Sequence, residues 1–238
     1  MPAAGVELST LLARIDAIMA EHPDERILIG IVGSPASGKT TLAQVLVNAL
    51  LHHRAPWIPE LGPITDPDRP WIGSHVAHVP MDGYHLADVE LRRLGRANRK
   101  GAPDTFDANG YRDLLARIKR QNGDVWAPAF DREIEQPIAG SIPVLCSTRV
   151  VVTEGNYLLL EDPEWAETRK LFAEVWFCDL DPDVRLQRLI SRHIRYGKSP
   201  EAAKAWAGGP DQRNADVIDA TRVRADLVLT GDVTPGCD

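Results

Sequence analysis

A glycine-rich loop stands between an apolar run and an amphipathic segment, and it constrains the fold more than any other feature. Residues 27–32 read ILIGIV, residues 33–40 read GSPASGKT, and apolar residues then recur at helical spacing over 42–50. The apolar run is typical of a strand buried on both faces of a parallel sheet. The loop matches G-x-x-x-x-G-K-[ST] in full, in the strand-to-helix context that this phosphate-binding motif requires. The sequence therefore predicts a strand, a phosphate loop and a helix, in that order.

The chemistry of this loop predicts a bound nucleoside triphosphate. Its glycines let backbone N–H groups turn toward phosphate oxygens, and the helix N-terminus adds partial positive charge. Lys39 would reach the β- and γ-phosphates, and the Thr40 hydroxyl would bind Mg²⁺. The residues that we expect to contact ATP are Gly33, Ser34, Pro35, Ala36, Ser37, Gly38, Lys39, Thr40 and Thr41.

The loop alone does not distinguish GTPases, ATPases and small-molecule kinases, because all of them share it. A GTPase needs a base-reading N-K-x-D motif, which the sequence lacks. A D-x-x-G match occurs at 107–110, but it opens a helical pattern instead of following a strand, so we interpret it as accidental. The L-S-G-G-Q signature of transport ATPases is also absent from the sequence.

Four further apolar runs predict the rest of the sheet. They lie at about 75–80, 150–152, 175–177 and 227–229, with helical patterns between them. Alternating strands and helices indicate a doubly wound α/β sheet. We therefore predict an α/β P-loop NTPase fold with a five-stranded, mainly parallel sheet, helices on both faces and a helical lid.

The same patterns predict the domain organisation. Apolar residues at spacings of three and four predict an amphipathic N-terminal helix within 1–25, and the phosphate-loop domain would occupy 26–238. Five prolines between residues 55 and 71 forbid a helix or a central strand there, so we expect an insertion at about 53–73. The lid is expected at about 185–212.

Composition argues against several other classes of protein. The formal charge of −7 disfavours a broad footprint on nucleic acid or anionic membrane. The three cysteines, Cys146, Cys178 and Cys237, form neither a metal-ligand spacing nor a disulfide framework, which indicates a reducing compartment. No stretch approaches the roughly 20 apolar residues of a membrane span. We expect a cytoplasmic protein with no nucleic-acid or membrane partner.

Two acidic residues each follow a predicted strand and precede a glycine. Asp82 stands before Gly83, and Glu154 stands before Gly155. Both carboxylates should project at the carboxyl edge of the sheet, where ligands of open α/β folds bind. Asp82 could accept a proton from an attacking hydroxyl or orient Mg²⁺, and Glu154 could hold Mg²⁺ or its water shell. The alternatives are structural: an N-cap role for Asp82 before a helix near Leu86, and a purely structural carboxylate at Glu154.

Four segments together resemble a known family. They are the phosphate loop, PMDGYH at 80–85, RKGAPDTFD at 99–107 and EGNY at 154–157. This order resembles the family of uridine kinase, type I pantothenate kinase and phosphoribulokinase. It is most similar to the nucleoside/nucleotide kinase-like, or fructose transport system kinase-like, branch. The resemblance covers about residues 26–231, and the 99–107 segment is specific to this group.

The resemblance implies roles for individual residues. Asp82 would be the catalytic base. The segment FDR at 130–132 weakly resembles a family segment beside the acceptor, which makes Asp131 and Arg132 candidate acceptor contacts. The residues that would bind the acceptor are Tyr84, His85, Arg99, Lys100, Asp131, Arg132, Asn156 and Tyr157. A solvated surface turn remains the alternative for Arg99, Lys100 and Arg132.

Four arginines recur three or four residues apart in the expected lid. They are Arg185, Arg188, Arg192 and Arg195. Such a row repels itself unless anions or carboxylates lie opposite. We expect a lid that closes on ATP phosphates, with Arg192 and Arg195 stabilising transition-state charge. A solvated helix face paired with neighbouring acids is the alternative.

The resemblance and the motifs predict in-line transfer of the ATP γ-phosphoryl group to a hydroxyl of a small metabolite, with Mg²⁺. The acceptor would be a nucleoside, a pantothenate-like compound or a sugar. The alternative is a regulatory protein that binds ATP without metabolite kinase activity. The expected partners are this small-molecule acceptor and, as a base rate for small enzymes, a second copy in a homodimer.

Overall fold

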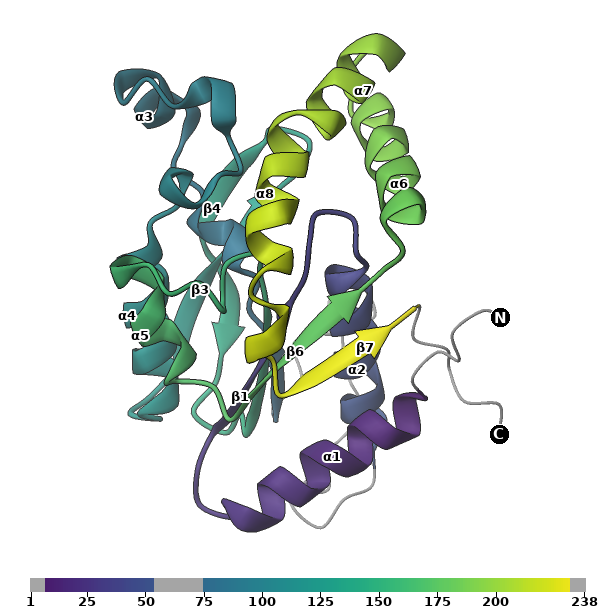
Figure 1. Cartoon of the computed structure of the whole chain (residues 1–238). Coiled ribbons are helices and arrows are strands. Elements are labelled where there is room, and N and C mark those ends of the chain that lie inside the picture. The colour runs from purple at the N-terminus through teal and green to yellow at the C-terminus, as the bar shows by residue number, and fades with distance from the viewer. Residues whose placement is uncertain (1–6, 54–74, 232–238) are drawn as a thin grey trace.

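The computed structural model describes residues 7–53 and 75–231 and contains a five-stranded sheet in the order β2-β5-β1-β6-β7. Every pairing in this sheet is parallel. The five predicted strands are therefore confirmed, and Figure 1 shows β6 and β7 side by side at one edge of the sheet. Their bounds are β1 Ile27–Val32, β2 Val76–His78, β5 Val150–Glu154, β6 Glu174–Asp179 and β7 Leu227–Thr230.

Helices cover both faces of the sheet, as predicted (Figure 1). One face packs against α1 and α2, and the other packs against α4 and α5. Along β1, Ile29 and Ile31 belong to the first of these cores, whereas Leu28 and Val32 belong to the second. The strand is apolar throughout because both of its faces are buried. These helices span Leu8–Glu21 (α1), Lys39–His52 (α2), Ala108–Lys119 (α4) and Pro163–Arg169 (α5).

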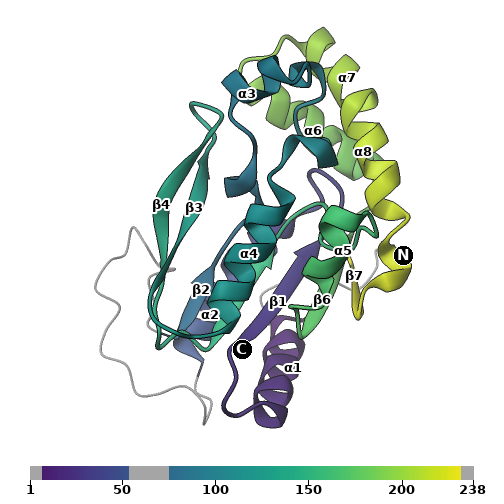
Figure 2. The same cartoon turned by 90° about the vertical axis from the view of Figure 1, so that its left-hand side faces the viewer.

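A β-hairpin beside the sheet is an element that the sequence patterns did not predict. Strands β3 (Val125–Asp131) and β4 (Gln136–Val144) pair in antiparallel fashion, with a register shift between Ala127 and Ala129. Figure 2 shows the hairpin standing next to β2. Its polar and apolar residues do not alternate cleanly, since Pro128, Pro137 and Pro143 interrupt the pattern.

Helices also rise above the carboxyl ends of the strands (Figures 1 and 2). On one side the chain between β2 and α4 forms four short helices: η1 (Met81–Tyr84), α3 (Asp88–Arg93), η2 (Ala97–Arg99) and η3 (Pro103–Thr105). On the other side stand α6 (Pro182–Arg195), α7 (Pro200–Gly208) and α8 (Pro210–Asp219), and η4 (Arg222–Arg224) leads into β7. These three longer helices occupy the region predicted as a lid. The proline-rich segment lies almost wholly outside the described residues.

The D-x-x-G match has a structural explanation. Asp107 is the N-cap of α4, and its carboxylate accepts a hydrogen bond from the Gly110 N–H at 2.9 Å. The motif therefore begins a helix, as the sequence pattern indicated.

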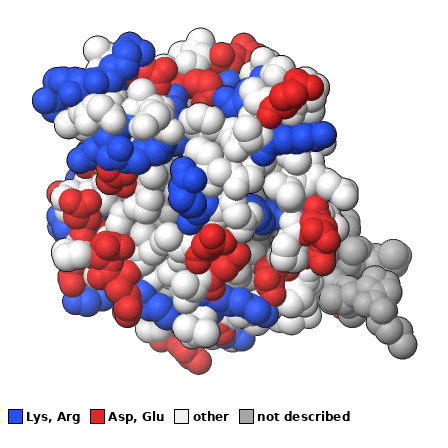
Figure 3. All heavy atoms as spheres, turned by 45° about the horizontal axis from the view of Figure 1, so that its top comes forward, with Lys and Arg blue, Asp and Glu red and all other residues white. Residues whose placement is uncertain are grey.

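Two properties of the described residues concern possible partners. No helix among them is long and apolar enough to cross a membrane. Figure 3 looks onto the upper part of the molecule, where Lys and Arg side chains lie among Asp and Glu side chains rather than in a field of one sign.

Arg26 joins three parts of the fold at the start of β1. Its side chain is buried, and its guanidinium donates to the carbonyls of Ile118, Leu145, Cys146 and Thr148 at 2.6–3.1 Å. These carbonyls belong to the end of α4 and to the turn before β5. One side chain thus donates to several carbonyls at a helix end and in a turn, where backbone partners are few.

We expect Arg26→Met to destabilise the protein by about 1–3 kcal/mol, because it removes the hydrogen bonds of the buried guanidinium. The loss stays moderate because the carbonyls of Ile118, Leu145 and Thr148 each keep a second donor. The free energy of unfolding in urea measures this loss. Arg14→Met is the matched control, since the Arg14–Glu174 pair is partly exposed and such pairs contribute roughly 0–1 kcal/mol. Equal losses in the two variants would contradict the role assigned to Arg26.

Candidate active site

A cavity of about 430 Å³ opens at the carboxyl ends of the strands. Because β5 pairs with both β1 and β2, the loops that follow these three strands meet there. The cavity brings together many of the predicted site residues. Those that line it are Pro35, Lys39, Thr40, Asp82, His85, Lys100, Arg132, Glu154, Asn156 and Arg192.

The phosphate loop at 33–38 forms the wall between β1 and α2. A Cβ on Gly33 would lie 2.7 Å from the backbone carbonyl oxygen of Cys178, so only glycine fits at this position. Gly38 has a φ of +95°, in the region that favours glycine. The Ser37 hydroxyl is buried and has no hydrogen-bond partner among the described residues. The loop therefore presents an unsatisfied donor in a tight cradle, as an anion site requires.

Lys39 is a buried cation at the first residue of α2. Its Nζ donates to the Ser34 carbonyl at 3.1 Å, and it forms no ion pair with a carboxylate in the described chain. Burial lowers the pKa of Lys39, while the charge of nearby Glu154 opposes this shift. An anion bound beside Lys39 would compensate its charge, which agrees with the predicted phosphate contact.

Glu154 and Thr40 form the candidate metal position. The Thr40 hydroxyl donates to Glu154 Oε1 at 3.0 Å. Burial and the charge of Asp82 raise the pKa of Glu154 to about 6, and Lys39 and Thr40 act in the opposite direction. No group of three or more His, Cys, Asp or Glu side chains within 7–53 and 75–231 could hold a metal alone. The oxygen donors of Thr40 and Glu154 do fit Mg²⁺, which in nucleotide sites is completed by phosphate oxygens and water.

The glycines after the two acids each allow a close approach, Gly155 between the ends of β5 and β2, and Gly83 between the Asp82 turn and the hairpin. A Cβ on Gly155 would lie 2.6 Å from the Met81 Cβ, and a Cβ on Gly83 would overlap the Pro128 carbonyl. Asp82 and Glu154 can therefore line one cavity, with the β3–β4 hairpin packed over the Asp82 turn. The predicted acid-glycine pairs have a steric basis.

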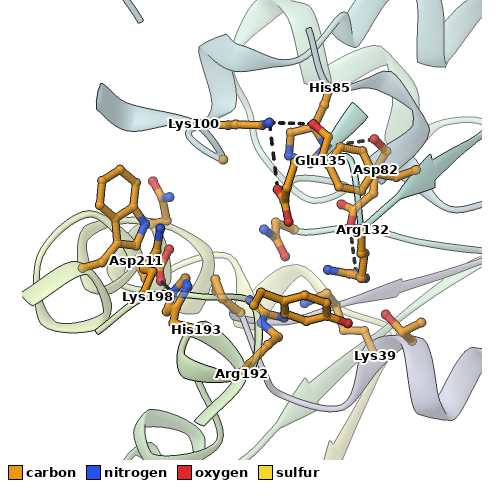
Figure 4. A pocket seen from close by; sticks show the side chains of 18 of the residues that line it. Lys39, Asp82, His85, Lys100, Arg132, Glu135, Arg192, His193, Lys198 and Asp211 are labelled. Atoms are coloured by element: carbon orange, nitrogen blue, oxygen red, sulfur yellow. Dashed lines mark hydrogen bonds and ion pairs between the residues drawn. The ribbon is translucent and has the colours of Figure 1, made fainter. Parts of the chain in front are cut away.

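Asp82 itself is not a helix N-cap, because α3 begins at Asp88 after Ala87. Its Oδ2 instead pairs at 3.2 Å with Nη2 of Arg132, which lies in the turn of the β3–β4 hairpin. Figure 4 shows Asp82 and Arg132 pointing toward each other at the cavity wall. The structure thus brings Asp82 and Arg132 together. Of the two residues in the weak family match, Arg132 lines the cavity and Asp131 does not.

The row of arginines on α6 is divided between different environments. Arg192 lines the cavity, and its pKa is lowered by burial and by the charge of Arg132. Arg185 is buried and donates to Gln212 Oε1 at 2.6 Å, whereas Arg195 is exposed and outside the cavity. The structure therefore places Arg192, but not Arg195, where it can contact a substrate.

On the opposite wall, Lys100 and His85 are held by their neighbours. Lys100 Nζ lies 2.7 Å from both Asp88 Oδ1 and the Glu135 carbonyl. The His85 ring stacks between other aromatic rings, 4.0 Å from Phe106 and 4.7 Å from Phe130 by centroids. Burial lowers the pKa of His85. Both side chains therefore shape the cavity from fixed positions.

The structure does not bring all predicted residues to the cavity. Those that it places outside the lining are Gly33, Ser34, Ala36, Ser37 and Gly38, which form the phosphate loop itself, and Thr41, Tyr84, Arg99, Asp131, Tyr157 and Arg195. The Asp131 carboxylate accepts the Glu133 N–H at 2.8 Å and so stabilises the hairpin turn. The Tyr157 ring is fully buried.

Internal contacts account for the other displaced residues. The Tyr157 hydroxyl donates to the Gly101 carbonyl, and Arg99 pairs with Asp104 at 2.7 Å. Tyr84 packs against a neighbouring aromatic ring, and Thr41 is exposed on α2. Tyr84, Arg99 and Tyr157 thus pack within the walls of the cavity, whereas Thr41 faces away from it.

Several lining residues had no signal in the sequence. They are Asp88, Glu135, His193, Lys198, Trp206, Asp211 and Asn214. His193 Nε2 lies 2.6 Å from Asp211 Oδ2, so this pair joins α6 to α8 at the cavity. Each of these residues stands alone in the sequence, without a motif or a ligand spacing, so no pattern predicted it as part of the site.

Comparison with known proteins places this site in context. No protein-family model matches the sequence. The chain is 31% identical to a uridine kinase-like protein of Schizosaccharomyces pombe, over 86% of this chain and 83% of the relative. It is 32% identical to an ATP-dependent kinase-like protein of Aspergillus versicolor, over 63% of this chain and 94% of that protein.

The solved structure of a fructose transport system kinase-like protein from Silicibacter sp. TM1040 superposes with a TM-score of 0.78. The two sequences are 33% identical, and the match covers 94% of this chain and 99% of the other. With its complete phosphate loop and these relatives, the chain belongs to the P-loop kinase family of uridine kinase and type I pantothenate kinase that its motifs resemble.

Proposed function

We propose that this protein transfers the γ-phosphoryl group of ATP to a hydroxyl of a small-molecule acceptor. One observation carries the proposal: the carboxylate of Asp82 and the cations of Lys39 and Arg192 line one cavity beside the phosphate loop. Its volume of about 430 Å³ lies within the usual range for small-molecule sites. Nucleoside, pantothenate-like and sugar acceptors all fit this class.

Asp82 is the group placed to receive the proton of the acceptor hydroxyl. Its ion pair with Arg132 holds the carboxylate at the cavity wall, and Glu154 lies in the same buried region. Transfer of a phosphoryl group requires a positioned hydroxyl more than covalent chemistry. A fixed carboxylate supplies both the orientation and a proton acceptor.

Cations surround the space in which the phosphoryl group would move. Lys39, Arg132 and Arg192 reach it from α2, the hairpin and α6. Negative charge spreads over the phosphoryl oxygens during transfer, so fixed cations lower the barrier. Thr40 and Glu154 would hold Mg²⁺, and the bound ion would neutralise charge on the β- and γ-phosphate oxygens.

A regulatory ATP-binding role explains less of the cavity. A nucleotide sensor has no need of a carboxylate such as Asp82, fixed by Arg132 beside an enclosed space. The relatives are named as kinases, which does not favour a purely regulatory role.

Asp82→Asn is expected to lower acceptor-dependent turnover on the order of 10²-fold or more, because the amide cannot accept the proton; this corresponds to at least ~2.7 kcal/mol of barrier. ADP release with ATP and Mg²⁺, across nucleosides, pantothenate, sugars and sugar phosphates, measures the effect. Asp131→Asn is the matched control, since Asp131 caps the hairpin turn outside the cavity. Near-normal turnover by Asp82→Asn, with ATP bound normally in calorimetry, would refute the assignment of the base.

Glu154→Gln is expected to stabilise the metal-free protein at pH 8. The pKa of Glu154 is raised from 4.5 to about 6 by burial and by Asp82, so the folded state binds this proton more tightly than the unfolded state. Its stabilising contribution is complete below about pH 4.5 and is lost as the pH rises through about 6. Glutamine remains neutral throughout, so the variant should unfold at a higher temperature than the wild type at pH 8.

Thermal unfolding in EDTA, followed from pH 4.5 to pH 8, tests this expectation. The advantage of the variant should shrink as the pH falls. Glu133→Gln, at an exposed position, controls for a general loss of negative charge. A stability difference that does not change with pH would show that the Glu154 carboxyl is not destabilised by ionisation.

A further inference from the structure

The carboxylates that line the cavity are all engaged with other groups of the protein. They are Asp82, Asp88, Glu135, Glu154 and Asp211. Arg132 pairs with Asp82, and Lys100 pairs with both Asp88 and Glu135. The Thr40 hydroxyl donates to Glu154, and His193 contacts Asp211. None of these carboxylates depends on a ligand for its partner.

Three of the lining cations differ in this respect. Lys39, Arg192 and Lys198 form no ion pair with a carboxylate within the described chain. Lys39 and Arg192 lie where the phosphoryl group of ATP would pass, so the nucleotide accounts for them. Lys198 is left, and Figure 4 shows it across the cavity from Lys39, beside His193 and Asp211.

Lys198 is held at this position by an aromatic ring. Its Nζ lies 4.9 Å from the centroid of Trp206, and both side chains line the cavity. Such a ring favours the cation without neutralising it. Figure 4 shows Asp211 beside Lys198, but Asp211 Oδ2 already lies 2.6 Å from His193 Nε2.

An amide accompanies this cation. Asn214 on α8 also lines the cavity, is only 9% exposed, and forms no hydrogen bond with the other described residues. The amide atoms of Asn214 are not enclosed within the protein, so a ligand in the cavity can reach them. A fixed ammonium together with a free amide is a donor set suited to the oxygens of a carboxylate or a phosphate.

We propose that the acceptor carries an anionic group, a carboxylate or a phosphate ester, which binds Lys198 and Asn214 while its hydroxyl lies at Asp82. This inference rests on the proposed kinase function. A neutral acceptor that filled the cavity would remove Lys198 from water without giving it a counter-ion, which costs free energy. Lys198, in the connection between α6 and α7, thus selects charged acceptors over their neutral analogues.

The experiment uses matched acceptors that differ only in the charged group. The pairs are ribose with ribose 5-phosphate, fructose with fructose 6-phosphate, and pantothenyl alcohol with pantothenate. We expect the anionic member of at least one pair to accelerate ADP release more strongly than its neutral partner. Whether that member is a phosphate ester or a carboxylate identifies the group that is recognised. Neutral members that are used equally well would overturn the inference.

Lys198→Met tests the residue directly, because methionine keeps the apolar stem and removes the charge. We expect the KM of the anionic acceptor to rise on the order of tenfold with little change in kcat, and the KM of the neutral member to stay unchanged. Lys204→Met on the adjoining helix α7 is the matched control, since Lys204 is exposed and outside the cavity. An equal rise of KM for both members of a pair would overturn the role of Lys198.

Calorimetry in the presence of ADP and Mg²⁺ separates this inference from the kinase function. If no acceptor stimulates turnover but an anionic member binds the wild type and not Lys198→Met, the kinase function fails and the anion site stands. If neutral members turn over while no anionic member binds, the kinase function stands and the anion site is refuted. Failure of every anionic member to bind refutes the anion site in either case.

Discussion

The parallel pairing of β5 with both β1 and β2 is the contact on which the rest of the site depends. Ile31 of β1 lies in register with Glu154, and His78 of β2 lies in register with Val152. The three strands therefore end together, although the segments that follow them are far apart in the sequence. Any other strand order would separate the phosphate loop from the two acids.

A buried side-chain network extends the pairing of β2 and β5 beyond its last backbone contacts. The Thr153 hydroxyl donates to the Val79 carbonyl, and it accepts a hydrogen bond from the Tyr111 hydroxyl at 2.6 Å. Because Thr153 precedes Glu154 and Val79 lies just before the Asp82 turn, this network fixes the spacing of the two strand ends. Helix α4 supplies the tyrosine, so the apolar core beneath the sheet also supports the site.

The fold could be predicted largely from the sequence because its signals are local. A buried parallel strand is a short apolar run, and a phosphate loop is a contiguous motif; both are complete within a few residues. Asp82 and Glu154 were found for the same reason, since each stands at the end of such a run. The steric need for the following glycines adds a physical basis to that pattern.

The rest of the site could not be predicted, because tertiary packing decides it. The hairpin escaped detection since prolines disturb its alternation, yet it brings Arg132 and Glu135 to the cavity. A helical spacing placed Arg192 and Arg195 in one set, whereas the packing of α6 leaves only Arg192 at the cavity. Residues such as Lys198 become informative only once their neighbours are known.

Helix α8 connects the two halves of the cavity. Near its end, Asp219 accepts a hydrogen bond from the Ser34 hydroxyl of the phosphate loop at 2.5 Å. Near its start, Asp211 contacts His193 on α6, the neighbour of Arg192 in the chain. A helix of 10 residues spans about 15 Å, so one element joins the phosphate loop to the helix that carries Arg192. The position of Arg192 is therefore tied to the phosphate loop through α8, and both walls of the cavity share this support.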